Sequence, residues 1–122
     1  MKNKILIVDD DMNYVNLLQI FLEGDGFKVM TSYRGKQALN IMLNEKIDLV
    51  LLDYQMPEMT GFEVLDYMNN NGFETKIPVI MVSANYEKEV FDLAFAKGVK
   101  DFVYKPLLLE DLLKKIGIVN QV

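Results

Sequence analysis

Four apolar runs in the sequence each end on polar residues that can take part in phosphate chemistry. The runs cover residues 4–8, 47–52, 78–82 and 102–104. The polar residues that follow these runs are Asp9, Asp10, Asp11, Asp53, Ser83 and Lys105. Short, nearly continuous apolar runs are typical of parallel strands that helices cover on both faces. Because the carboxyl ends of parallel strands share one edge of a sheet, we expect these side chains to meet there.

Carboxylates, a hydroxyl and an ammonium at one edge suit the transfer of a phosphoryl group to a carboxylate. Crowded carboxylates repel one another, and a divalent cation relieves that repulsion. Mg²⁺ prefers a few carboxylates, retained waters and a substrate phosphate. Asp9 and Asp10 are candidate anchors for such an ion, and Asp53 is a candidate ligand and nucleophile. Lys105 and Ser83 are candidates for stabilising negative charge on the transferring group.

Helical patterns alternate with the strands and predict one α/β domain. They cover residues 13–23, 36–43, 61–68, 86–97 and 108–116. Asp11 is expected to cap the first helix, and Gly98 is a natural C′ glycine for the fourth. A less apolar strand over residues 27–32 is expected at an edge of the sheet. The pattern indicates a single doubly wound (βα)₅ domain over residues 1–122, with a parallel sheet and helices on both faces.

The composition argues against several classes of function. The chain has no cysteine, which excludes disulfides and thiolate metal sites, and a net charge of −5 disfavours binding to nucleic acid or a membrane surface. No apolar stretch reaches the roughly 18 residues of a membrane span, and the sequence shows no signal-peptide pattern. Because the chain has no histidine, a phosphohistidine donor must be another protein. We therefore expect a cytoplasmic protein without nucleic-acid or membrane partners.

The sequence resembles the receiver domains of bacterial two-component response regulators, of the chemotaxis-regulator type. The resemblance covers essentially all 122 residues and depends on four motifs. These are ILIVDDD at 5–11, LLDYQMPEMTG at 51–61, PVIMVSA at 78–84 and KGVKDFVYKP at 97–106. Each motif alone is weak, but all four in this order, each at the end of a predicted strand, are specific. The fold that accompanies the resemblance is a flavodoxin-like sheet with strand order 2-1-3-4-5.

The resemblance implies a role for each matching residue near the acidic cluster. Asp53 matches the phosphoacceptor, while Asp9 and Asp10 match the acidic pair that binds Mg²⁺, for which Mn²⁺ can substitute. Gln55 matches the position whose backbone carbonyl joins the metal. Gln55 and Asn85 also match positions that flank the phosphoryl group and tune its lifetime, although both could be ordinary polar loop residues.

The resemblance also implies a switch. Ser83 matches the hydroxyl that turns toward the phosphoryl group, and Lys105 matches the lysine that pairs with it. The peptide bond between Lys105 and Pro106 is expected to be cis. Phe102 matches the aromatic switch residue, which is often tyrosine in the family. Since phenylalanine has no hydroxyl to hydrogen-bond in either position, we expect its inward state to be partly populated before phosphorylation.

Phe91 and Phe95 have two interpretations that the sequence leaves open. They are four residues apart in the fourth predicted helix and therefore share one face. Val90, Leu93 and Ala94 already predict an inward-facing stripe on this helix. The two phenylalanines are therefore either additional core residues or a surface on which a partner docks.

The function that these residues predict is a phosphorylation-operated switch. A histidine kinase or phosphotransfer protein would donate to Asp53. The face formed by the fourth helix, the fifth strand and the fifth helix would then change and control a downstream protein or output domain. The chain is not expected to be an enzyme beyond catalysing its own phosphorylation and dephosphorylation. We expect a monomer or a weak homodimer.

Two other classes are compatible with an α/β domain of this kind. An aspartate-nucleophile phosphatase of the haloacid-dehalogenase type generally has a second acid two residues after the nucleophile, where this sequence has Gln55. A flavodoxin-like electron carrier needs a loop rich in hydroxyls and glycine after the first strand to hold the flavin phosphate. The three aspartates at 9–11 would repel that phosphate, which disfavours the electron carrier. The phosphatase is disfavoured because Gln55 cannot donate a proton as an acid does.

Overall fold

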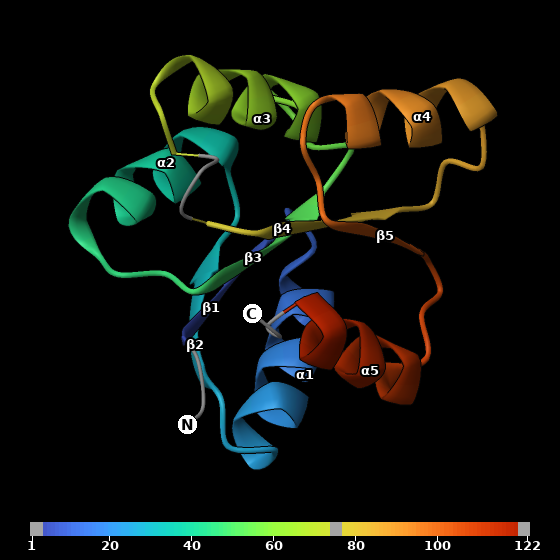
Figure 1. The fold of residues 1–122 in the computed structure, drawn as a ribbon. Coiled ribbons are helices and arrows are strands. Elements are labelled where there is room, and N and C mark those ends of the chain that lie inside the picture. Colours follow the sequence, from blue (N-terminus) through green and yellow to red (C-terminus); the bar gives the residue numbers. More distant parts are fainter. Residues whose placement is uncertain (1–3, 74–76, 120–122) are drawn as a thin grey trace.

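The computed structural model describes residues 4–73 and 77–119 of the chain, so both ends of the predicted domain 1–122 lie outside it. Within these ranges five strands alternate with five helices (Figure 1). The strands are β1 (Lys4–Val8), β2 (Lys28–Ser32), β3 (Leu49–Asp53), β4 (Val79–Ser83) and β5 (Asp101–Tyr104). The helices are α1 (Met12–Gly24), α2 (Gly35–Asn44), α3 (Gly61–Asn70), α4 (Lys88–Ala96) and α5 (Leu109–Val119). None of these helices is both long and apolar enough to cross a membrane.

The five strands form one parallel sheet in the order β2-β1-β3-β4-β5. This confirms the predicted fold and strand order. The direction of chain winding reverses between β1 and β3, and open α/β sheets bind ligands at the carboxyl ends of such neighbouring strands. β2 lies at one edge, as its weaker hydrophobicity predicted, and most of its residues are only partly buried.

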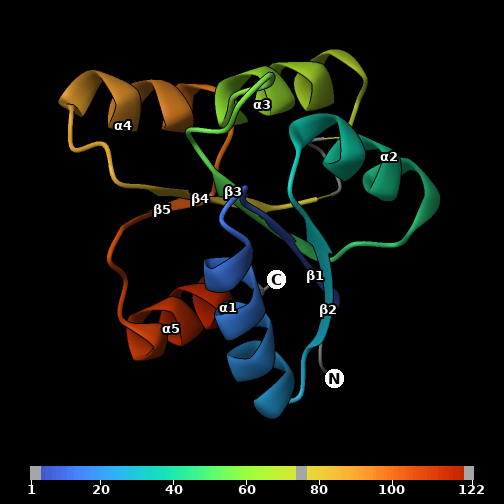
Figure 2. The same cartoon turned by 180° about the vertical axis from the view of Figure 1, so that it is seen from behind.

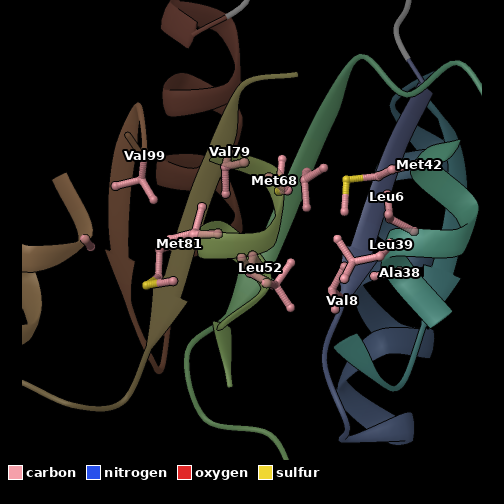
Figure 3. Close-up of a cluster of buried hydrophobic side chains, with 14 of the residues drawn as sticks. Leu6, Val8, Ala38, Leu39, Met42, Leu52, Met68, Val79, Met81 and Val99 are labelled. Carbon is pink, nitrogen blue, oxygen red and sulfur yellow. The ribbon is translucent and has the colours of Figure 1, made fainter. Parts of the chain in front are cut away.

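Helices cover both faces of the sheet. α2, α3 and α4 lie on one face, and α1 and α5 lie on the other (Figures 1 and 2). Along β1 the side chains alternate between the two layers: Ile5 and Ile7 pack with residues of α1 and α5, and Leu6 and Val8 pack with residues of α2 and α3. Figure 3 shows part of this second cluster. Burial on both faces explains why the strand sequences are continuous apolar runs rather than alternating ones.

The fourth helix is shorter than the sequence predicted. The pattern indicated residues 86–97, but α4 begins at Lys88 and ends at Ala96. The side-chain oxygen of Asn85 accepts a hydrogen bond from the backbone N–H of Glu87 at 2.8 Å. Such a local turn competes with helical hydrogen bonds, which delays the start of the helix. At the other end Gly98 has a φ of 101°, which confirms its prediction as the C′ glycine.

The predicted inward stripe of α4 is partly wrong. Val90 and Ala94 are buried, but the side chain of Leu93 is 46% exposed. Phe91 is half-buried and packs against the core cluster instead, while Phe95 is 39% exposed. Residues two positions apart on a helix point about 200° apart, so a helix that turns Phe91 toward the core turns Leu93 away from it. The two phenylalanines therefore differ: Phe91 joins the core, and Phe95 lies at the surface.

Candidate functional site

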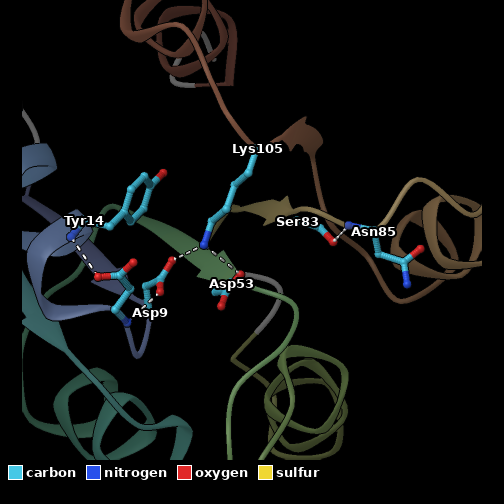
Figure 4. A network of polar contacts seen from close by, with 7 residues as sticks. Asp9, Tyr14, Asp53, Ser83, Asn85 and Lys105 are labelled. Carbon is cyan, nitrogen blue, oxygen red and sulfur yellow. Dashed lines mark hydrogen bonds and ion pairs between the residues drawn. The ribbon is translucent and has the colours of Figure 1, made fainter.

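The polar residues at the strand ends border one pocket, as a parallel sheet requires. Asp9 follows β1, Asp53 ends β3, Ser83 ends β4, and Lys105 follows β5. Figure 4 shows the side chains of Asp9, Asp53 and Lys105 converging from separate elements, while the Ser83 hydroxyl is turned toward Asn85. The pocket has a volume of about 330 Å³ and is lined by Asp9, Asp10, Asp11, Asp53, Gln55, Ser83, Ala84 and Lys105. The structure thus brings every predicted site residue to this edge except Asn85, which lies in the loop after β4, and Phe102, which lies within β5.

Asp9 is the most constrained of the three consecutive aspartates. Its side chain is buried, and Oδ1 accepts a hydrogen bond from the backbone N–H of Asp11 at 3.0 Å. The other oxygen, Oδ2, accepts from the ammonium of Lys105 at 2.7 Å. Asp11 itself caps α1, because its side chain accepts from the backbone N–H of Tyr14 at 3.2 Å. The predicted capping role of Asp11 is therefore confirmed.

Asp9, Asp10 and Asp53 have the arrangement of a candidate metal centre. Each offers one carboxylate oxygen, and these oxygens lie within 4.8 Å of one another. Asp10 is exposed at the mouth of the pocket, and Gln55 is an exposed neighbour on its rim. Hard carboxylate oxygens open to solvent on one side are the donor set that Mg²⁺ prefers. The residues present therefore fit the ion that the sequence predicted.

The ammonium of Lys105 bridges two of these carboxylates. Nζ lies 2.7 Å from Oδ2 of Asp9 and 3.3 Å from Oδ1 of Asp53. Burial lowers the pKa of Lys105, but its hydrogen bond to Asp9 and the charge of Asp53 outweigh that effect and raise the pKa above its ordinary value. The side chain therefore stays positively charged beside the candidate nucleophile. The peptide bond between Lys105 and Pro106 is cis, as expected.

The close approach of α3 to the end of β3 places Asp53 at the floor of the pocket. A Cβ at Gly61, the first residue of α3, would lie 2.5 Å from the backbone oxygen of Asp53, so only glycine fits there. The N–H of Gly61 donates to the carbonyl of Tyr54 at 2.8 Å. Thr60 and Glu63 form a capping box that fixes the start of this helix. The carboxylate of Asp53 is therefore presented on a well-held backbone and is 6% exposed.

The surroundings of Asp53 favour its protonated form. Burial is the main cause and the charge of Asp9 adds to it, while Lys105 opposes both. Together these effects raise the pKa of Asp53 from 3.8 to about 7. A carboxylate with a raised pKa stores unfavourable free energy in the folded state whenever it is ionised.

Replacing Asp53 with asparagine should therefore stabilise the metal-free protein at alkaline pH. Since the folded pKa exceeds the unfolded one, ionised Asp53 costs stability as the pH rises from about 4 to 7, and the cost is complete above that range. We expect Asp53→Asn to raise the free energy of unfolding by about 2 kcal/mol at pH 8. Urea unfolding in EDTA at pH 4, 6 and 8 measures this. A gain that is equal at all three pH values would contradict the electrostatic cause.

Ser83 points into the loop that leads to α4. Its side chain is buried, and Oγ accepts a hydrogen bond from the backbone N–H of Asn85 at 2.9 Å. Asn85 is half-buried and also bonds to Glu87 through its side chain. Rotation of the Ser83 hydroxyl toward Asp53 would remove the acceptor from the Asn85 N–H. The position of this hydroxyl is therefore linked to the conformation of the loop.

Phe102 occupies an inward position in this structure. Its side chain is 4% exposed. Its ring centroid lies 5.3 Å from that of Phe91 and 5.0 Å from that of Tyr104. These contacts place the ring between α4 and β5 without any hydrogen bond from a hydroxyl.

Sequence reasoning missed two tyrosines that contact the site. The hydroxyl of Tyr86 donates to the backbone carbonyl of Lys105 at 2.7 Å, and its ring stacks on that of Tyr104 at 4.7 Å. Tyr14 lies under the ammonium of Lys105, with its ring centroid 4.6 Å from Nζ. Tyr14 stands three residues after the cap Asp11, a position in the first turn of α1 that could have indicated a side chain near the strand ends.

Comparison with known proteins decides the family. The sequence model of one protein family, the response regulator receiver domain, matches residues 5–117 of this chain. The chain belongs to the response regulator receiver family. Response regulator GtcR of Aneurinibacillus migulanus is 35% identical over 106 residues, which are 87% of this chain and 43% of GtcR. The chain thus spans about half the length of the relatives that it matches.

Solved receiver structures have the same fold. A CheY-like receiver domain protein from Methanospirillum hungatei JF-1 has a TM-score of 0.88 and 29% identity, covering 97% of this chain and 93% of that one. Response regulator TrrA from Thermotoga maritima, in complex with Mg²⁺ and BeF, has a TM-score of 0.84 and 29% identity, covering 98% and 99%. The expectation of a two-component receiver domain, first raised by the sequence motifs, is therefore confirmed.

Proposed function

We propose that this receiver domain is a phospho-accepting switch. A histidine kinase or phosphotransfer protein donates a phosphoryl group to Asp53, and the face formed by α4, β5 and α5 then controls a downstream protein or output domain. The observation that carries this proposal is one pocket whose lining combines buried Asp53, the ammonium of Lys105, Ser83 and three further aspartates. A site with another function would not need a buried carboxylate, an ammonium, a hydroxyl and further carboxylates in one pocket.

The positions of the side chains support the proposed phosphorylation of Asp53. An oxygen of Asp53 forms a bond to phosphorus while the bond from phosphorus to the donor breaks, and the donor group leaves with the electron pair. Lys105, at 3.3 Å from Asp53, is placed to stabilise charge on the transferred group. Ser83 can rotate its hydroxyl from the loop toward the same group. The acyl phosphate that results is labile in base.

Asp9, Asp10 and Asp53, together with the backbone carbonyl of Gln55, are the proposed holders of Mg²⁺, for which Mn²⁺ can substitute. The spacing of the three carboxylates and the presence of Mg²⁺ in the TrrA complex support this assignment. The ion supplies positive charge that offsets the negative charge of the carboxylates and the phosphoryl group. Gln55 and the half-buried Asn85 flank the pocket and are proposed to tune the lifetime of the phosphoryl group.

The proposed output surface is partly apolar. Leu93, Phe95 and Tyr86 are exposed on or next to α4, and Tyr104 is half-buried beside them on β5. Phosphorylation would pull Ser83 and Lys105 toward the phosphoryl oxygens and shift the population of loop and α4 conformations. We further propose a cytoplasmic monomer or weak homodimer that has no direct nucleic-acid or membrane partner and catalyses only its own phosphorylation and dephosphorylation.

The phosphatase alternative has less support. Gln55, two residues after the nucleophile, cannot donate a proton as an acid would. The pocket also lies open at the sheet edge, with exposed Asp10 and Gln55 at its mouth. These features suit a large protein donor better than a small substrate that must be enclosed.

Beryllofluoride with Mg²⁺, which mimics the phosphoryl group on Asp53, tests the switch. We expect changes in amide chemical shifts at Ser83, Phe91 and Phe102, beyond the immediate neighbours of Asp53. Because Phe102 is already buried, we expect its shift change to be smaller than that of Ser83. Two-dimensional NMR spectra with and without beryllofluoride provide the measurement.

Two results would count against this proposal. Shifts confined to the neighbours of Asp53 would indicate a phosphate relay or sink rather than a propagated switch. The Asp53→Asn variant is the control, and shift changes in it at the same beryllofluoride concentration would mean that the probe binds elsewhere.

A further inference from the structure

Tyr14 provides a third contact for the ammonium of Lys105. Two sides of this ammonium face carboxylates, with Nζ at 2.7 Å from Asp9 and 3.3 Å from Asp53. A third side faces the ring of Tyr14, whose centroid is 4.6 Å from Nζ (Figure 4). A cation over an aromatic face at this distance is attracted by the ring, more strongly where water is excluded.

The backbone holds the Tyr14 ring in this place. The N–H of Tyr14 donates to the side chain of Asp11, which caps α1 and fixes its first turn. The ring is half-buried and lines an apolar pocket of about 510 Å³, whose walls also include Leu17, Ala84, Lys105, Pro106, Leu107 and Leu109. Lys105 borders both this pocket and the phosphorylation pocket. Tyr14 therefore forms the wall against which the lysine side chain rests.

The hydroxyl of Tyr14 does not explain the presence of tyrosine here. Within the described part of the chain this oxygen is buried and has no hydrogen-bond partner. Burial of an unpaired hydroxyl is unfavourable, so the oxygen contributes nothing to holding the ring. The ring itself packs against the core cluster on the α1 side of the sheet, and its face contacts the ammonium of Lys105.

We propose that Tyr14 is a positioning residue that holds the ammonium of Lys105 beside Asp53 during phosphorylation. This inference depends on the proposed function of Asp53 and Lys105. When a phosphoryl group reaches Asp53, the ammonium must exchange its bond to Asp9 for contacts with phosphoryl oxygens. The ring limits the space into which Lys105 can move on that side.

Phosphorylation by acetyl phosphate with Mg²⁺ tests the role of the ring. The group transferred to Asp53 leaves acetate behind, and intact mass gives the initial rate. We expect Tyr14→Leu to lower this rate about tenfold, an effect between those of an exposed and a fully desolvated cation–π contact. Tyr14→Phe restores the aromatic face and should bring the rate back to within about twofold of the parent. Tyr14→Met, which has no ring but fills much of the space, repeats the test if the leucine variant does not fold.

A double-mutant cycle separates positioning from a structural effect. In a Lys105→Ala background, Tyr14→Leu should cause no further loss of rate, because the ammonium that it positions is absent. Leu17→Ala is the matched control, since Leu17 lines the same apolar pocket on α1 but is an exposed aliphatic side chain without an aromatic ring. This variant should keep the parent rate.

The outcomes distinguish this inference from the proposed function. If the parent protein is phosphorylated but Tyr14→Leu and Tyr14→Met keep its rate, the positioning role is wrong and the function stands. An equal loss in the presence and absence of Lys105 would also overturn the role, as would a Tyr14→Phe variant as slow as Tyr14→Leu. If the parent takes up no phosphoryl group, both proposals fail together.

Discussion

Replacing Asp53 with asparagine should abolish phosphorylation of this chain. Asparagine keeps the shape of the side chain but removes the anionic oxygen that attacks phosphorus. Of the other aspartates that line the pocket, Asp11 caps α1, and Asp9 and Asp10 are the proposed anchors of Mg²⁺. After incubation with Mg²⁺ and acetyl phosphate, intact mass should show a base-labile adduct in the parent and none in the variant.

Asp11→Asn is the matched control for this experiment. It removes one negative charge from the same pocket, yet asparagine caps a helix as well as aspartate does. The control should therefore keep its fold and gain one phosphoryl group. A full-strength adduct on Asp53→Asn would show that another residue is the acceptor, and the assignment of Asp53 would have to be withdrawn.

The strand-end residues were predictable because the signal needs little tertiary information. Apolar runs that lead directly into Asp9, Asp53 and Ser83 indicate parallel strands, and parallel strands must bring their carboxyl ends to one edge. The prediction that Asp11 caps α1 succeeded for a similar reason, since capping involves only neighbouring residues. Local sequence order was enough for both results.

The misses involve packing between distant elements. Leu93 was predicted as a core residue, but α4 is rotated so that Phe91 contacts Phe102 and Leu93 is exposed. The approach of Tyr14 to Lys105 joins residues 91 positions apart in the sequence, and no motif marks it.

Glu58 adopts a φ of 70° in the loop after β3, where a glycine would have signalled the conformation.

The start of α4 was predicted two residues too early for a different reason, which is a local turn at Asn85. The prediction of a helix over residues 86–97 depended on the helical pattern of these residues and did not include hydrogen bonds from the side chain of Asn85. In the structure its side chain bonds to Glu87 and its N–H bonds to Ser83. These bonds connect the loop to Ser83 at the pocket, and the same local turn accounts for the later start of α4.

Replacing Asp10 with asparagine should make phosphorylation nearly independent of Mg²⁺ and much slower. Asp10 is exposed, so the fold should survive the change. The variant loses one of the three carboxylates whose oxygens lie within 4.8 Å of one another, and with it a hard anionic ligand. We expect the initial rate with acetyl phosphate at saturating Mg²⁺ to fall roughly a hundredfold.

The dependence of the rate on Mg²⁺ concentration distinguishes loss of a ligand from loss of charge. Asp11→Asn lowers the charge of the same pocket equally, but Asp11 does not belong to the three-carboxylate cluster. Its rate should therefore rise with Mg²⁺ as the parent rate does, while the Asp10→Asn rate stays low. An unchanged Mg²⁺ dependence in Asp10→Asn would place the metal elsewhere. A matching loss in Asp11→Asn would instead attribute the effect to the net negative charge of the pocket, because both substitutions remove a single carboxylate from its lining.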